Sequence, residues 1–561
     1  IHYHLSGTTS DGSFSINSDT DITIALDNLQ MTSLSSPVIN ISKAVTATFL
    51  LNNANHLADD ANNGKNNALA GKGNLIFEGD GSLVLQAHKK NGISSDMALT
   101  IHGGDIQITA KADDGKAMKA VEDITIQGGN IIISVSGDQS KAISGDSNTY
   151  IKGGNINITA SGTTVLESAG SGYDPSYCSA IKSDGDISVS GGALTIDLPN
   201  SNKGGKGLSA DGNISISGGT IHITTAGDGA TYTNESGATD SYTSACIKSD
   251  VDIAILGGTI YCSSSGKGGK GISADGTLVL GQEGQADSGL FLEVKTSGER
   301  FYVSGSTGGG GGGGWPPGGG NQDNADYANP KAIKSEGNLT INSGVINIYC
   351  TQSDEGGEGL ESKATLTING GNIHVEAHDD CINAANHIQI DGGSVYCQSS
   401  GNDAIDSNGT ITIAGGQTIA HGSRSPEGGF DCDNSTFKIL GGIVIGTGGD
   451  TSTPSSSAST QYGIIYNNAS AGSKIALKDA NDNYLLLFEL PTFSGSSGGG
   501  WGNSMTVLFS DPGLDKGTYT LQYGGSISGG TTVDGYNTGG TYSGGSTKSV
   551  TISNNRIVTV R

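Results

Sequence analysis

The sequence has few charged, basic and aromatic residues. Charged residues make up 15% of the chain and aromatic residues 5%, with only two tryptophans. The 55 Asp and Glu residues outnumber the 29 Lys and Arg residues, so the formal net charge is −26. Such a chain repels phosphate backbones, and we do not expect nucleic acid as a partner. Surplus carboxylates suit either solubility or cation binding.

Long apolar runs and helical periodicity are also absent. No run of about 18 apolar residues occurs, so we predict no transmembrane segment. No signal peptide is visible, but the chain opens inside a strand-like pattern (IHYHLSGTT), so we expect a preceding segment. No window keeps a period of about 3.6 residues, as an amphipathic helix would. The seven cysteines have neither zinc-type spacing nor a disulfide pattern, and we expect them to pack in the core.

Glycine is abundant, and its pairs recur regularly. Where no insertion intervenes, Gly-Gly returns every 22 to 27 residues among the 93 glycines, with a short aliphatic strand on each side. Residues 180–198 (AIKSDGDISVSGGALTIDL) are a clear copy, in which Ile187 and Val189 alternate with polar residues. Alternation of this kind indicates half-buried strands, and a fixed period indicates stacked units.

We therefore predict an all-β fold, a right-handed parallel β-helix with three strands per coil and a C-terminal β-rich cap. A leucine-rich repeat lacks support because its Leu and Asn spacing is missing, and a propeller blade needs roughly 40 residues or more. We predict irregular first coils over 1–85 and regular coils over 86–446. Residues 463–561 lose the Gly-Gly register and read as antiparallel hairpins. Insertions are expected at 161–178, 225–245 and 281–331.

The first strand of each unit changes charge along the chain. In the earlier units its outward positions carry lysine beside a carboxylate, which favours neutralising ion pairs. In the last four units they become acidic, and neighbouring strands stack ~4.8 Å apart. Crowded carboxylates must raise their pKa or bind a cation, and Ca²⁺ takes six to eight oxygen ligands, so we predict Ca²⁺ here. The predicted ligands are Glu358, Glu361, Asp379, Asp380, Asp403, Asp406 and Asp431.

The insertions bring aromatic residues to one face of the predicted β-helix, because they all leave from the same corner. Sugar stacking or contact with a partner is one interpretation of these residues, and local packing is the other. Lysines fall in every second coil beside the insertions, ~9.6 Å apart, close to a disaccharide repeat. They could bind successive uronates or merely neutralise neighbouring carboxylates. The predicted carbohydrate-binding residues are Lys182, Lys248, Lys334, Trp315, Tyr173, Tyr242 and Tyr327.

Several segments resemble one family. HKKNGISSDMALTIHGGDIQITAKADDGKAM, AIKSDGDISVSGG and VLFSDPGLDKGTYTLQYGG are similar to a bacterial family of secreted carbohydrate-binding β-helix proteins, long described as a domain of unknown function. The resemblance covers nearly the whole chain. It implies a fold like that of calcium-dependent pectate lyases, an extracellular or cell-surface location, and calcium-dependent binding of acidic plant polysaccharide.

The resemblance also bears on catalysis. In polysaccharide lyase family nine, calcium residues precede a catalytic lysine in an NGFK motif. Asp379-Asp380 and the segment 402–406 (NDAID) look like the calcium part, but Asp431 stands where that lysine would be. A lyase needs a base within reach of the proton it removes, and Lys363 is the weak remaining candidate. Non-catalytic binding is therefore favoured, while a surface protein that binds another protein, or an active lyase, stays open.

Overall fold

The computed structural model describes residues 1–62, 64, 66–285, 288–305, 326–352, 356–493 and 503–561. None of them lies in an α-helix, and within them no helix has the length and apolar character needed to cross a membrane. Counting both compact units together, the chain forms a β-solenoid of about 16 turns with parallel sheets. Unit 1 comprises 1–253, 258–273 and 295–330, and unit 2 comprises 254–257, 274–294 and 331–561. The predicted all-β parallel solenoid is confirmed.

Unit 1 is built by repetition of short strands that pair with the equivalent strands one turn away. For example, β13 (Lys116–Ala120) pairs in parallel with β10 (Asn91–Ser95) and β16 (Lys141–Gly145). The inward residues Met118 and Ile143 are in register and fully buried. The sheet continues in unit 1 through β2 (Phe14–Asn17), β4 (Ile39–Lys43), β7 (Asn67–Gly71), β10, β13, β16, β21 (Ser179–Ser183), β24 (Lys206–Ala210) and β29 (Ala245–Ser249).

The rest of each turn consists of a very short strand and a longer one. β14 (Ile124–Ile126) and β15 (Asn130–Val135) follow β13, and both pair in parallel with their equivalents in adjacent turns. The Gly-Gly pair makes the corner between them. Gly129 has φ +88°, and a Cβ there would lie 2.7 Å from the Gly104 carbonyl oxygen. Glycine is needed because both the backbone angle and the close approach of the next turn exclude a side chain.

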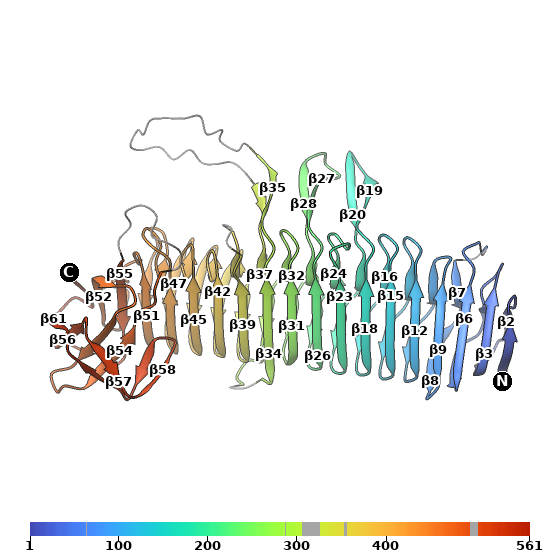
Figure 1. Cartoon of the computed structure of the whole chain (residues 1–561), viewed down its shortest axis with the longest axis horizontal. Helices are drawn as coiled ribbons and strands as arrows, with labels where there is room; N and C mark the ends of the chain where they lie inside the picture. The colour runs from blue at the N-terminus through green and yellow to red at the C-terminus, as the bar shows by residue number, and fades with distance from the viewer. Residues whose placement is uncertain (63, 65, 286–287, 306–325, 353–355, 494–502) are drawn as a thin grey trace. The chain divides into compact units, whose positions relative to one another are not determined.

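Three antiparallel hairpins interrupt the turns of unit 1. They are β19 (Val165–Ala169) with β20 (Gly172–Ser176), β27 (Ala230–Thr233) with β28 (Thr239–Tyr242), and β35 (Phe301–Ser304) with β36 (Asp326–Ala328). A bridge from Tyr173 to Asn234 joins the first two hairpins, and β28 contacts β35. Figure 1 shows all three projecting from the same edge of the solenoid, side by side. We call residues 165–176, 230–242, 301–304 and 326–328 the hairpin wall.

One predicted insertion is shorter than expected. The range 281–331 contains β34 (Leu290–Thr296), in which Leu290, Leu292 and Val294 are buried in the alternating pattern of the other long strands. This turn has no Gly-Gly pair before its long strand, so the repeat was hidden in the sequence. Among the described residues of this range, β35 and β36 form the hairpin that leaves the solenoid.

Unit 2 repeats the same parallel pattern and then changes. Its first strands are β37 (Lys331–Ser335), β40 (Glu358–Ser362), β43 (Ile382–Ala384), β46 (Ile405–Ser407) and β49 (Phe430–Asp431). After β51 (Ile443–Gly448) the pairing becomes largely antiparallel, and Phe488 and Phe509 pack in one apolar cluster with Ile419 and Ile445. The later strands include β52 (Gly463–Ser470), β53 (Lys474–Lys478), β54 (Tyr484–Glu489), β55 (Ser504–Ser510), β56 (Gly517–Tyr523), β61 (Ser546–Ile552) and β62 (Ile557–Val560).

Candidate functional site

A cleft of about 440 Å³ in unit 1 lies between the first hairpin of the wall and the sheet formed by the first strand of each turn. Its floor comes from four consecutive strands, β16, β21, β24 and β29, and its side from residues 174–177 and Glu167. We call it the lysine cleft. Its lining residues with charged or aromatic side chains are Lys141, Lys182, Lys206, Lys248, Glu167, Asp174, Asp211, Asp250 and Tyr177.

The two predicted lysines of this cleft are held in ion pairs. Lys182 pairs with Asp211 and lies 3.8 Å from Asp184, measured from Nζ to Oδ1. Lys248 lies 3.1 Å from Asp250. In unit 2, Lys334 pairs in the same way with Glu336, at 2.6 Å. These contacts fit the interpretation that the lysines neutralise neighbouring carboxylates.

Lys206, Tyr177 and Lys141 were not predicted as site residues, although they also line the cleft. Lys206 is buried, and its Nζ donates a hydrogen bond to the Thr243 carbonyl and lies 4.4 Å from the Tyr177 ring centroid. Burial raises the pKa of the Tyr177 hydroxyl above its ordinary value, so the phenol stays neutral. The alternation of lysine with serine between neighbouring turns could have pointed to Lys141 and Lys206, whereas no repeat pattern marks Tyr177.

The predicted tyrosines belong to the hairpin wall. Tyr173 on β20 is 44% exposed. Tyr242 on β28 packs edge-on against Tyr177, with ring centroids 6.3 Å apart. Tyr327 on β36 stacks under the Arg300 guanidinium at 4.3 Å. Trp315 lies outside the described residues.

The predicted calcium ligands lie on, or just before, consecutive first strands of the turns in unit 2. Glu361 is in register with Asn383, which is in register with Asp406, which is in register with Asp431. Asp379, Asp380 and Asp403 precede these strands, and Glu358 begins β40. We call the seven predicted carboxylates the acidic cluster: Glu358, Glu361, Asp379, Asp380, Asp403, Asp406 and Asp431.

Hydrogen bonds satisfy only part of this cluster. The Asn383 amide donates to Asp380 Oδ2 and Asp406 Oδ2, each at 3.0 Å. Asp379 accepts bonds from the Gly356 N–H and the Asn402 amide, each at 2.6 Å. The second oxygens of three buried carboxylates have no hydrogen-bond partner among the described residues. They are Asp380 Oδ1, Glu358 Oε2 and Glu361 Oε2.

Burial and mutual repulsion shift the titration of these groups. Burial, then neighbouring Asp379 and Asp406, raise the pKa of Asp380 to about 9. Burial raises the pKa of Asp403 to about 8, and burial with Asp431 raises that of Asp406 to about 7. The pKa of Glu358 also rises to about 7, mainly through burial. At neutral pH several of these carboxyls therefore keep a proton unless a cation replaces it.

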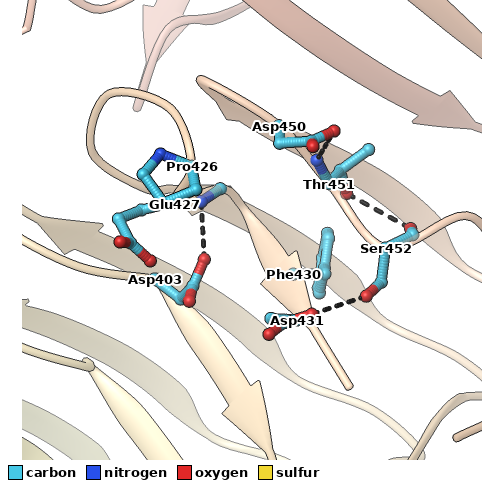
Figure 2. A pocket seen from close by; sticks show the side chains of 9 residues that line it. Asp403, Pro426, Glu427, Phe430, Asp431, Asp450, Thr451 and Ser452 are labelled. Carbon is cyan, nitrogen blue, oxygen red and sulfur yellow. Dashed lines mark hydrogen bonds between the residues drawn. The ribbon is translucent and has the colours of Figure 1, made fainter. Parts of the chain in front are cut away.

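A hollow of about 340 Å³ opens beside the end of the cluster. Figure 2 shows Asp403, Glu427, Asp431 and Asp450 around it. Asp403 accepts a 2.5 Å bond from the Gly428 N–H, and Asp431 accepts one from the Ser452 hydroxyl at 2.8 Å. Glu427 and Asp450 were not predicted, because they lie in loops outside the repeat. Across the described residues, no three His, Cys, Asp or Glu side chains already converge as a metal site.

The lysines near the cluster are poorly placed to act as bases. Lys331 Nζ lies 2.5 Å from Glu358 Oε1 and 3.6 Å from Glu361 Oε1. Although burial lowers the pKa of Lys331, these two carboxylates outweigh it and raise the pKa above its ordinary value. Lys363, the weak catalytic candidate, is in an ion pair with Glu361. Lys331 therefore stays protonated at neutral pH and cannot abstract a proton, and the ion pair holds the Lys363 amine against Glu361.

Comparison with known proteins identifies the family. A model of the carbohydrate-binding domain-containing protein family matches residues 2–170, 139–288 and 319–404, which together are more than half of the chain. The chain belongs to this carbohydrate-binding domain family. The resemblance to a carbohydrate-binding β-helix family is thus confirmed. No curated protein and no solved structure matched the chain.

The matched segments cover most of both features described above. The second segment includes the whole floor of the lysine cleft, from Lys141 to Lys248. The third includes the acidic cluster from Glu358 to Asp403. Asp406 and Asp431 lie beyond the matched residues of this carbohydrate-binding family.

Proposed function

We propose that this protein binds acidic polysaccharide at the lysine cleft, without cleaving it, and that calcium on the acidic cluster is required for full binding. The observation that carries the proposal is the cleft itself, in a member of a carbohydrate-binding family. Its lining combines lysines, carboxylates and a tyrosine. Such a mixture donates to ring and carboxylate oxygens, accepts from sugar hydroxyls and offers an aromatic surface.

The shape of the cleft floor supports an extended ligand. Four parallel strands contribute to the floor, and neighbouring strands lie ~4.8 Å apart. A glycan chain that runs across these strands would meet a similar set of side chains at each step. Individual exposed charge contacts contribute only about 0.2–1 kcal/mol each, so binding strength should rise with glycan length.

The acidic cluster fits a hard cation by its donor chemistry. It offers carboxylate oxygens from successive coils, and three of those oxygens are buried without a hydrogen-bond partner. Ca²⁺ accepts carboxylate ligands in flexible arrangements. Asp380, Asp403, Asp406 and Glu358 would hold it, with Asp379, Asp431 and Glu361 nearby. The positive charge of the cation would offset the repulsion between these carboxylates, so that they could all ionise at neutral pH.

We also infer, as expected from the sequence, a right-handed coil with three strands, a C-terminal cap over 463–561 and a bacterial cell-surface location. Non-catalytic binding is favoured because Asp431 stands where a lyase lysine would be, and because Lys331 and Lys363 are paired with carboxylates.

A glycan array probed with the purified chain in calcium and in EDTA tests this function. We expect signals on polygalacturonate and other acidic glycans in calcium, and weak signals in EDTA. Signals confined to neutral glycans would contradict the acidic ligand. Absence of any glycan signal would contradict carbohydrate binding and favour a protein ligand.

A further inference from the structure

The four lysines of the cleft follow a zigzag. Lys141, Ser179 and Lys206 are in register on successive strands, as are Ser144, Lys182, Ser209 and Lys248. Each strand of the floor therefore presents one lysine, which alternates between two columns. Two lysines of one column lie two strands apart, ~9.6 Å, with a short serine between them.

The lysines differ in how far their charge is compensated. Asp184 and Asp211 offset Lys182, and Asp250 offsets Lys248. Lys206 is different, since it donates to a backbone carbonyl and stacks on an aromatic ring, as described above. The column of Lys182 and Lys248 is thus close to neutral before any ligand arrives.

Lys141 makes no ion pair within the part of the chain that the structure describes. Its Nζ donates a hydrogen bond to the Gln139 carbonyl at 3.0 Å. Its neighbour in register is another lysine, Lys116, which already pairs with Asp114. Burial, and then the charge of Lys116, lower the pKa of Lys141. Asp114 and Glu167 act in the opposite direction, but neither is within ion-pair distance of Lys141, so Lys141 is a half-buried cation with no ion-pair partner among the described residues.

We propose that Lys141 is the residue of the lysine cleft that recognises an anionic group of the bound glycan, a carboxylate or a sulfate. The inference rests on the proposed function and adds the residue that sets its preference for acidic over neutral chains. An anion beside Lys141 supplies the direct ion pair that the described residues do not, while Tyr177, in the same cleft, offers a ring for the adjoining sugar.

The zigzag also sets how the charged groups of the ligand should be arranged. One strand spacing is close to the length of one sugar residue in an extended chain. In a two-fold chain, successive residues point to opposite sides, and the lysines on successive strands alternate between two columns. Lys141 occupies one column at the first strand of the floor, so it recognises an acidic group on that side.

The test compares Lys141→Ala with Lys119→Ala. Lys119 lies on the adjacent strand β13, pairs with Asp146 at 3.1 Å and does not line the cleft, so it is a matched control. Each variant is titrated calorimetrically with an oligogalacturonate, a sulfated galactan oligomer and a neutral galactan oligomer of equal length. Thermal unfolding checks that each variant is folded.

We expect Lys141→Ala to weaken binding of one or both acidic oligomers about tenfold and to leave the neutral oligomer within about twofold. The oligomer with the larger loss identifies carboxylate or sulfate as the preferred group. Lys141→Arg should keep the preference for that group. Equal losses for acidic and neutral oligomers, or no loss for either acidic oligomer, would overturn the role of Lys141 while leaving carbohydrate binding intact. If the parent bound none of the oligomers, both this inference and the proposed function would fail.

Discussion

Replacing Asp380 with asparagine isolates the electrostatic role of the acidic cluster. The side chain is 4% exposed, one oxygen accepts from Asn383, and the other has no partner. Asparagine has the same shape and can keep the bond from Asn383, but it cannot ionise. The substitution therefore removes the ionisable group without opening a cavity.

The expected size follows from the shifted titration. The pKa of Asp380 rises from 3.8 to about 9. In the absence of a cation, the folded carboxyl keeps its proton where the unfolded one has lost it. The free energy of unfolding therefore falls as pH rises from about 4 to about 9, and at pH 7 the loss is on the order of 4 kcal/mol. Asp380→Asn should remove this contribution and be more stable than the parent in EDTA at neutral pH.

Calcium should reverse the order of stability. A bound cation replaces the proton and stabilises the parent, whereas the variant offers a neutral amide in place of one carboxylate ligand. Urea unfolding in EDTA and in calcium, at about pH 5 and about pH 8, measures both effects. Asp391→Asn, at an exposed carboxylate of the same unit, is the control.

Two results would refute this reasoning. One is an Asp380→Asn variant whose stability in EDTA falls with pH as steeply as that of the parent, because the buried carboxyl would then not be the titrating group. The other is an unchanged stabilisation by calcium, because the cation would then be held elsewhere.

We make three further predictions, which concern Lys363, the predicted carbohydrate-binding lysines and His421. Polygalacturonate incubated with the parent should yield no unsaturated uronate by ultraviolet absorbance, and sustained product that Lys363→Ala abolishes would contradict the non-catalytic role. The triple variant Lys182/Lys248/Lys334→Ala should bind long oligogalacturonates less tightly and lose the gain in affinity with length, and an unchanged series would leave these lysines with ion pairing alone. Burial lowers the pKa of His421 to about 4. The free energy of unfolding should therefore fall by about 3 kcal/mol as pH falls from about 6.5 to about 4, and His421→Gln should flatten this decline relative to the parent in acid denaturation.

The fold could be predicted because each coil repeats the same local rules. Residues such as Ile187 and Val189 alternate with polar residues, and they are buried as that pattern requires. Gly129 marks a corner that only glycine can form. The strand Leu290–Thr296 was not predicted, because the repeat was identified from its Gly-Gly pairs and this turn has none before that strand.

The sites were less accessible from sequence. The register of β40, β43, β46 and β49 placed Glu361, Asp406 and Asp431 in one column, as their spacing suggested, and the other four predicted carboxylates precede or begin these strands. Lys141, Lys206 and Tyr177 were missed as cleft residues because their roles depend on how a hairpin folds against the sheet. Glu427 and Asp450 come from loops, where no repeat fixes their place.

The proposed function is calcium-dependent binding of an acidic glycan by the whole chain. Calorimetric titration with a long oligogalacturonate, first in calcium and then in EDTA, tests it most directly. We expect saturable binding in calcium that weakens at least tenfold in EDTA and is restored when calcium is added back. Binding of equal strength in EDTA, or none in calcium, would contradict it.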